Sequence, residues 1–244
     1  MPAGNAFVGS ADIRDGKKRR EPMDLKTAIM ERRSIRGFTD QPVSKETLKK
    51  VLQLAGRAVS AVNQQPWEFA VITGEMLKKI SRENMEYFQR AEAGDLDLHY
   101  GEGIYRPRRV EVGRQLFAAM DIAREDKEKR LWWTARGFRF FDAPAAIILM
   151  MDNSADEYSS RLDMGCVIQN ICLAAMEYGL GTCAAYQAIT YQEPLRRNLP
   201  CAAGKRFVCG IAIGYPDEAF PANGVITSRL DTDEITSWYG FEGD

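Results

Sequence analysis

Three arginines and a serine near the N-terminus are the residues best suited to binding a phosphate. They lie in the run Glu31-Arg32-Arg33-Ser34-Ile35-Arg36-Gly37-Phe38. On a helix, Arg32 and Arg36 would share one face because they are four residues apart. Two guanidinium groups on one face can hold a dianionic phosphate through charge-assisted, forked hydrogen bonds. The same arginines would also be favourable as cations at the negative end of a helix, so both interpretations stand at this point.

Two further runs carry polar groups and glycines. The first is Ser60-Ala61-Val62-Asn63-Gln64-Gln65-Pro66-Trp67, and the second is Gly179-Leu180-Gly181-Thr182-Cys183. With Ala184, the second run satisfies the loose Gly-x-Gly-x-x-Ala fingerprint of dinucleotide sites. That fingerprint requires a strand before the glycines and a helix after them. The sequence predicts the reverse order, with Gly179 ending a helix in the left-handed conformation, so we do not expect a Rossmann site.

Taken together and in this order, the three runs resemble the FMN-dependent nitroreductase family, and in particular its nitrobenzoate-reductase-like branch. Further matching segments are 114–117, 122–127, 140–144, 162–165 with 169–170, and 210–215. The resemblance extends from about Met23 to the C-terminus. It implies an α+β fold with a central mixed β-sheet enclosed by helices. It also implies an intertwined homodimer that holds FMN at the subunit interface.

The resemblance also implies which residues contact FMN. The matching positions are Arg32, Arg33, Ser34, Arg36, Ser60, Ala61, Asn63, Ala184, Ala185, Tyr186 and Arg229. Arg32, Ser34 and Arg229 would hold the phosphate region, and Arg36 would lie near the N1–O2 edge of the flavin. Ser60, Ala61 and Asn63 would come from the partner subunit, and the 184–186 stretch would pass beside the ring. Arg33 is either a phosphate contact or a surface or subunit contact.

The chain departs from the family pattern at a few positions. Val59 stands where a proline is frequent, and Thr227 stands where some relatives carry a second basic residue. Arg33 is a candidate replacement for that missing charge. Ala184 and Ala185 stand where relatives often carry proline and glutamine, which weakens the contacts inferred there. No catalytic side chain is assigned, because the chemistry would take place at flavin N5.

Composition excludes several classes of function. The chain has 244 residues, 45% of them hydrophobic and 27% charged, and a formal net charge of −1. This balance gives no general attraction to nucleic acid. The longest apolar run, Ala143–Met151, falls far short of the ~20 residues that a membrane-spanning helix needs. The first 22 residues lack the apolar stretch of an export signal. We therefore expect a cytoplasmic protein with a loose extension at 1–22 and one domain at 23–244.

The cysteines and the histidine also limit the chemistry. The five cysteines include no Cys-x-x-Cys pair, which argues against a disulfide framework and a zinc knuckle. The single histidine, His99, lies in a predicted loop and is interpreted as a surface or lid residue. A metal site and a histidine-dependent hydrolase are therefore poorly supported.

Hydrophobic periodicity and turn residues predict the elements that must position these groups. Two expected helices begin after Asp24 and after Ser44. Four more are expected to span 75–91, 110–129, 161–178 and 191–199. The expected strands span 67–73, 145–151, 182–186 and 207–213. The first helix is expected to end near Gly37, which would put Arg32–Arg36 around its last turn. Strand 145–151 lacks polar alternation and is expected to be buried on both faces.

The resemblance implies a flavin oxidoreductase. NADH or NADPH would reduce FMN, and a small aromatic nitro compound or a quinone-like molecule would then be reduced in a ping-pong reaction. The aromatic-rich segment 85–133 would form the lid over the substrate, although dimer packing is an equal alternative. Two other classes remain open. One is a different flavin reaction on the same fold, such as reductive dehalogenation, and the other is a non-catalytic flavin-binding protein.

Overall fold

The computed structural model of the chain describes residues 23–90 and 102–241. The helices are α1 (Leu25–Glu31), α2 (Lys45–Ala55), α3 (Gly74–Arg90), α4 (Arg106–Ala119), α5 (Lys127–Phe138), α6 (Glu157–Glu177), α7 (Gln192–Asn198) and α8 (Thr232–Ile235). The strands are β1 (Glu68–Thr73), β2 (Ala145–Asp152), β3 (Gly181–Ala185) and β4 (Lys205–Gly214). The predicted extension at 1–22 and His99 lie outside the described residues, and the division into an extension and one domain stays a prediction.

The four strands form one antiparallel sheet in the order β1-β2-β4-β3. The α+β class is therefore confirmed, but the expected mixed sheet is wrong for these strands. Helix α6 does return the chain so that β3 runs parallel to β2. Strand β4 then lies between the two and pairs antiparallel with both. The one parallel pairing in the described part of the chain is an isolated bridge between Ser34 and Thr182.

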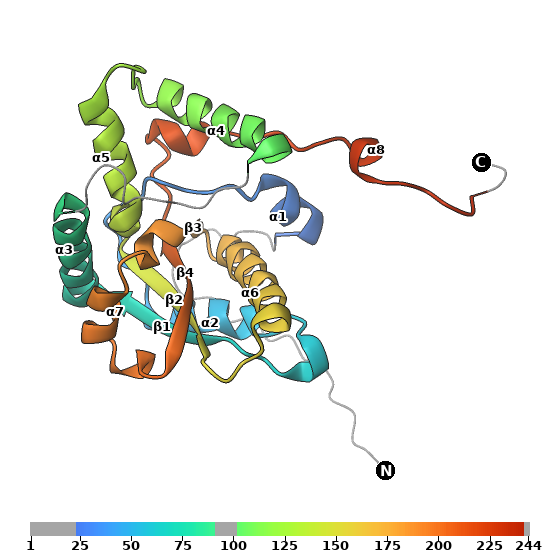
Figure 1. Cartoon of the computed structure of the whole chain (residues 1–244), viewed down its shortest axis with the longest axis horizontal. Coiled ribbons are helices and arrows are strands. Elements are labelled where there is room, and N and C mark those ends of the chain that lie inside the picture. Colours follow the sequence, from blue (N-terminus) through green and yellow to red (C-terminus); the bar gives the residue numbers. More distant parts are fainter. Residues whose placement is uncertain (1–22, 91–101, 242–244) are drawn as a thin grey trace, which may run out of the picture.

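Strand β2 is buried on both faces, as its sequence predicts. Alternate residues of a strand point to opposite faces of the sheet. Ala145, Ile147, Leu149 and Met151 pack with the buried residues of α2 and α6. Ala146, Ile148 and Met150 pack with those of α3 and α7. The sheet is therefore the middle layer between two groups of helices (Figure 1).

Several helix ends follow the local signals in the sequence. The Asp24 and Ser44 side chains cap α1 and α2 by accepting hydrogen bonds from backbone N–H groups three residues later. Gly179 follows α6 with a φ of 70°, which confirms the left-handed position predicted there. Among the described residues, no helix has both the length and the apolar character needed to cross a membrane.

The predicted end of the first helix is wrong. Helix α1 ends at Glu31, and Arg32 already has a non-helical ψ of 124°. Residues 32–38 are extended instead, because the Ile35 N–H donates to the Thr182 carbonyl at 2.9 Å and the Ile35 side chain is buried. Gly181 leaves room for that side chain, since a Cβ atom there would lie 2.5 Å from Ile35 Cγ1. Arg32 and Arg36 therefore do not share a helix face.

The predicted helix at 110–129 is also wrong in its second half. Helix α4 ends at Ala119, and Asp121 adopts a left-handed conformation with a φ of 50°. A separate helix, α5, then begins after Asp126, whose side chain accepts a hydrogen bond from the Lys129 N–H. Residues 120–126 therefore form a connection between two helices.

Burial of β2 predicts a large cost for truncating its side chains. Leu149→Ala should lower the free energy of unfolding by about 2–5 kcal/mol, because Leu149 is fully buried and its loss leaves a cavity. Leu54→Ala is the matched control, since Leu54 lies on α2 and is 48% exposed, and it should change stability by no more than about 0.5 kcal/mol. Urea unfolding followed by circular dichroism measures both. Equal effects of the two substitutions would contradict this account of the core.

Candidate functional site

The segment 31–38, called the N-terminal run below, crosses the end of the sheet at which β3 begins and β4 ends. Ser34 forms the bridge with Thr182, and Phe38 forms a bridge with Pro216. The Thr39 N–H donates to the Tyr215 carbonyl at 2.9 Å. The run is therefore held in place by its backbone, which leaves its polar side chains available for another group.

The three arginines of this run are not paired with any acidic residue that the structure describes. Among the described residues, no carboxylate lies within 4.0 Å of the guanidinium nitrogens of Arg32, Arg33 or Arg36. Arg32 and Arg36 are half-buried and Arg33 is exposed. Burial raises the pKa of the Cys183 thiol on β3, and the positive charges of Arg36 and Arg32 partly offset that rise. These two arginines thus lie near the start of β3, whereas Arg33 points to solvent.

The second run forms a strained turn. Residues 61–63 make one turn of 3-10 helix, in which Val62 and Asn63 have φ values of 45° and 58°. The buried Asp163 carboxylate of α6 holds this turn, because it accepts hydrogen bonds from the Ala61 N–H at 3.1 Å and from Gln64 Nε2 at 2.7 Å. Ala61 and Asn63 themselves are exposed.

Helix α6 sets the separation between these two runs. The turn at 61–63 is attached at Asp163, whereas Cys172 lies near Thr182, to which the N-terminal run is joined. These two positions are nine residues apart on one helix. At a rise of about 1.5 Å per residue, about 14 Å of helix lies between them. Within one chain, the two halves of the predicted site are therefore kept apart.

The predicted contacts at 184–186 differ in exposure. Ala184 is exposed, whereas the Ala185 side chain is buried in the core beside β2 and α7. Ala185 can therefore reach a ligand only through its backbone. Tyr186 follows β3 and is 62% exposed, so its ring does not pack against the sheet as a core residue.

The predicted C-terminal cation, Arg229, bonds to its own segment. Its Nη1 atom donates to Thr227 Oγ1 at 2.9 Å and to the carbonyls of Thr227 and Ser228 at 3.1 and 2.9 Å. With its neighbours and α4 it lines a small cavity of about 260 Å³. No hydrogen bond found in the described part of the chain joins Arg229 to the N-terminal run.

Three polar residues that organise the site were not predicted as site residues. They are Asp163, Arg136 and Asn223. Asp163 and Asn223 stand in segments that resemble the family, so a signal was present, but their hydrogen-bond partners lie about a hundred or more residues away. Arg136 is one of several arginines near α5, and nothing in the sequence separates it from the others.

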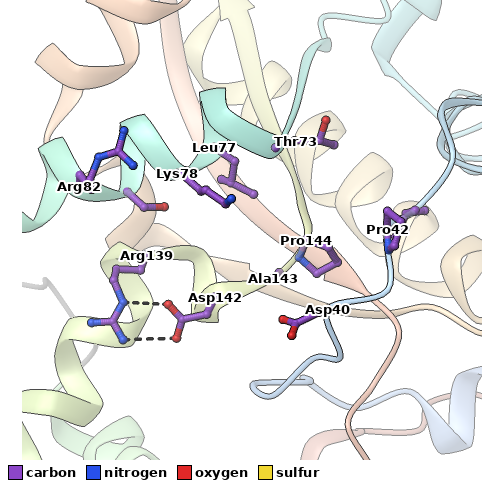
Figure 2. Close-up of a pocket in the computed structure, with 13 residues that line it drawn as sticks. Asp40, Pro42, Thr73, Leu77, Lys78, Arg82, Arg139, Asp142, Ala143 and Pro144 are labelled. Carbon is purple, nitrogen blue, oxygen red and sulfur yellow. Dashed lines mark hydrogen bonds and ion pairs between the residues drawn. The ribbon is translucent and has the colours of Figure 1, made fainter.

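Another cavity lies away from the N-terminal run. It measures about 720 Å³ and is lined where β1 ends and β2 begins, by residues that include Asp40, Leu77, Lys78, Arg139 and Asp142. Figure 2 shows that Arg139 and Asp142 pair with each other on one wall, at 2.8 Å. Lys78 pairs with Glu75 at 2.9 Å. Because none of the predicted contacts lines this cavity, we assign the candidate site to the N-terminal run.

In residues 23–90 and 102–241, the cysteines and acidic residues do not gather into a recognisable metal site. No group of three or more His, Cys, Asp or Glu side chains in the described ranges could hold a metal ion. Cys172, Cys183 and Cys209 are buried, and burial raises the pKa of Cys209 to about 12. A thiol with so high a pKa stays protonated and unreactive near neutral pH.

Loss of the Asp163 carboxylate should loosen the turn at 61–65. Asp163→Leu leaves the Ala61 N–H without its acceptor and the Gln64 amide with only its bond to Ser159 Oγ, which should cost about 1–3 kcal/mol of stability. Amide hydrogen exchange should accelerate at Ala61 while remaining slow in β2. Asp163→Asn is the conservative control, because it keeps one acceptor oxygen and should have a smaller effect. Unchanged exchange at Ala61 in both variants would exclude this role for Asp163.

Comparison with known proteins identifies the family. The model of the Nitroreductase family matches residues 29–215 of the chain. The nitrobenzene nitroreductase of Ectopseudomonas oleovorans is 36% identical over 216 residues, which cover 86% of this chain and 94% of that protein. The 4-nitrobenzoate reductase of Pseudomonas putida is 28% identical over 222 residues, which cover 90% and 97% of the two chains.

A solved structure agrees with the sequence matches. The crystal structure of the FMN and NADPH-dependent nitroreductase NfnB from sphigopyxis sp. strain HMH superposes with a TM-score of 0.84 at 30% sequence identity. The match covers 90% of this chain and 100% of that chain. The α+β nitroreductase-like fold and the resemblance to the family are thus confirmed. The chain belongs to the nitroreductase family and is an enzyme of that family.

Proposed function

We propose that this enzyme binds FMN and transfers a hydride equivalent from NADPH or NADH to an aromatic nitro compound. The proposal is supported by the similarity to NfnB, which is described as FMN and NADPH-dependent, and to a nitrobenzene nitroreductase. A quinone-like acceptor, reductive dehalogenation and non-catalytic flavin binding are the alternatives that the experiment below separates.

The observation that carries the proposal is the group of arginines that have no acidic partner within residues 23–90 and 102–241. Arg32 and Arg36 are half-buried cations beside the start of β3, and Ser34 adds a hydroxyl between them. Positive charges that are partly removed from water are costly unless an anion neutralises them. A phosphate dianion meets that requirement, since guanidinium groups bind it through forked hydrogen bonds. The residues present therefore fit the phosphate end of FMN.

We assign the following roles within this proposal. Arg32 and Ser34 hold the phosphate region, and Arg36 lies near the N1–O2 edge, where a fixed cation stabilises negative charge. Ala184, Ala185 and Tyr186 lie beside the ring, with Ala185 using its backbone. Arg33 either supplements the phosphate site or contacts a second subunit. Bound FMN would supply the redox chemistry, accepting a hydride at N5 and passing two electrons to the acceptor.

We also propose that two copies of the chain build each site. About 14 Å of α6 separates the N-terminal run from the turn that carries Ser60, Ala61 and Asn63. In this proposal a partner chain supplies that turn. Exposed apolar side chains suited to such an interface occur on α1, α6 and the C-terminal segment: Leu25, Ile29, Met30, Tyr158, Leu162, Ile235, Trp238, Tyr239 and Phe241. Figure 1 shows the C-terminal segment with α8 extending away from the rest of the molecule.

Anaerobic reduction tests the proposed reaction. Purified protein saturated with FMN should lose its yellow absorbance when NADPH or NADH is added, and a nitroaromatic acceptor should restore it. Nitroaromatic, quinone and halophenol acceptors offered separately distinguish the three catalytic alternatives. Protein that binds FMN but is not reduced by either nicotinamide would support binding alone. Protein that cannot be loaded with FMN would refute the proposal.

Removal of the C-terminal cation tests its assignment to the phosphate. Arg229→Ala should weaken FMN binding about five- to tenfold, because one charge-assisted contact is lost. Arg124→Ala is the control, since Arg124 is an exposed arginine in the connection between α4 and α5. Fluorescence titration of FMN measures both, and circular dichroism should show an unchanged fold. FMN affinity equal to that of the unaltered protein would remove Arg229 from the site.

A further inference from the structure

The side chain of Asn223 uses its whole hydrogen-bonding capacity on backbone groups. It is only 4% exposed and lies in a short 3-10 turn at 221–224. Its Oδ1 atom accepts from the N–H groups of Arg36 at 2.7 Å and Gly37 at 3.1 Å. Its Nδ2 atom donates to the carbonyls of Gly37 and Asp217, both at 2.8 Å. A primary amide has two donors and can accept twice at its oxygen, so Asn223 is fully satisfied.

A second buried side chain holds the same peptide from the other side. Arg136 of α5 donates from Nη2 to the Arg36 carbonyl at 2.8 Å and to the Phe141 carbonyl at 3.1 Å. Its Nη1 atom forms an ion pair with Asp142 at 2.9 Å. Both backbone polar groups of Arg36 are therefore bonded to buried side chains from distant parts of the chain. Rotation of the backbone at Arg36 would break the charge-assisted bond from Arg136 or the bonds that Asn223 Oδ1 accepts from the Arg36 and Gly37 N–H groups.

Close packing reinforces these bonds. The Arg136 guanidinium lies 4.8 Å from the ring centroid of Phe220, in the contact range of a cation–π pair. Phe220 in turn packs against Gly37, where a Cβ atom would lie 2.1 Å from Phe220 Cγ. The N-terminal run, helix α5 and the 217–223 segment are thus interlocked at one point.

We propose that Asn223 and Arg136 are positioning residues that fix the Arg36 backbone, and with it the cation at the flavin edge. This inference rests on the proposed function, because it assumes that Arg36 acts on bound FMN. Both residues act through hydrogen bonds to the Arg36 peptide. Asn223 also lies six residues before Arg229, so the same bonds anchor the segment that carries the C-terminal cation.

Two matched pairs of substitutions test this role. Asn223→Ala removes all four bonds, and Asn198→Ala is its control. Asn198 is also a buried asparagine, whose Nδ2 atom donates to Glu83 Oε2 and the Pro194 carbonyl, both at 2.8 Å, away from the N-terminal run. Arg136→Lys keeps the charge but loses the forked donor. Arg139→Lys is its control, since Arg139 pairs with Asp142 without bonding to Arg36.

The expected results separate positioning from general stability. Asn223→Ala and Arg136→Lys should each raise the Kd for FMN about tenfold and move the midpoint potential of the bound flavin to a more negative value. The two controls should lower the melting temperature by about as much as the two test variants do. Their Kd for FMN should stay within twofold of the value for the unaltered protein, and their midpoint potential should be unchanged within error.

The other possible outcomes would overturn either the positioning role or the proposed function. Unaltered FMN affinity and potential in both test variants would overturn the positioning role while leaving the proposed function intact. Equal effects in test and control variants would reduce it to general stability, which also overturns it. If Asn223→Ala does not fold, Arg136→Lys decides. Failure of the unaltered protein to bind FMN would instead refute the proposed function itself.

Discussion

The burial of β2 on both faces is the constraint that arranges the rest of the molecule. A strand without a polar face must lie between two layers, so α2 and α6 cover one side of the sheet and α3 and α7 the other. The faces of the sheet are thereby used for packing. The N-terminal run therefore lies at the end of the sheet, where the Thr182 and Tyr215 carbonyls accept hydrogen bonds from the Ile35 and Thr39 N–H groups. The position of the candidate site follows from this arrangement.

The parts of the fold that depend on local signals could be predicted from the sequence. The unbroken apolar pattern of β2, the Ser44 cap and the left-handed Gly179 all act within a few residues. The end of α1 could not be predicted, because it depends on the space that Gly181 leaves for Ile35. The expected mixed sheet was wrong because strand pairing is not recorded locally either. Whether β4 lies between β2 and β3 is decided by pairing across the sheet, and no local pattern in any one strand records it.

The candidate site was predictable in its chemistry but not in its geometry. The arginines and Ser34 could be identified from their types and order, yet the helix face invoked to bring Arg32 and Arg36 together does not exist. What aligns the run is its backbone bonding to Thr182, Asn223 and Arg136. Those bonds span about a hundred residues or more, and an asparagine amide or a single arginine has no sequence signature for such a role. Long-range backbone recognition is therefore the part of the site that only a structure reveals.

The turn at 61–65 is strained and exposed, whereas the backbone of Arg36 is held by hydrogen bonds to other parts of the chain. Val62, Asn63 and Gln65 have φ values of 45°, 58° and 46°. This conformation costs a residue other than glycine about 1–2 kcal/mol. Val62 is 98% exposed, so packing of its side chain within its own chain does not offset that cost. Hydrogen bonds oppose it instead, since the Ala61 N–H donates to the Asp163 carboxylate and the Gln65 N–H donates to Ser60 Oγ. Strain persists where the surroundings fix a segment for another purpose. A turn that presents Ala61 and Asn63 outward is consistent with the proposal that it completes the site of a second copy. The fully bonded Arg36 peptide is consistent with the proposal that each chain holds its own N-terminal run in place.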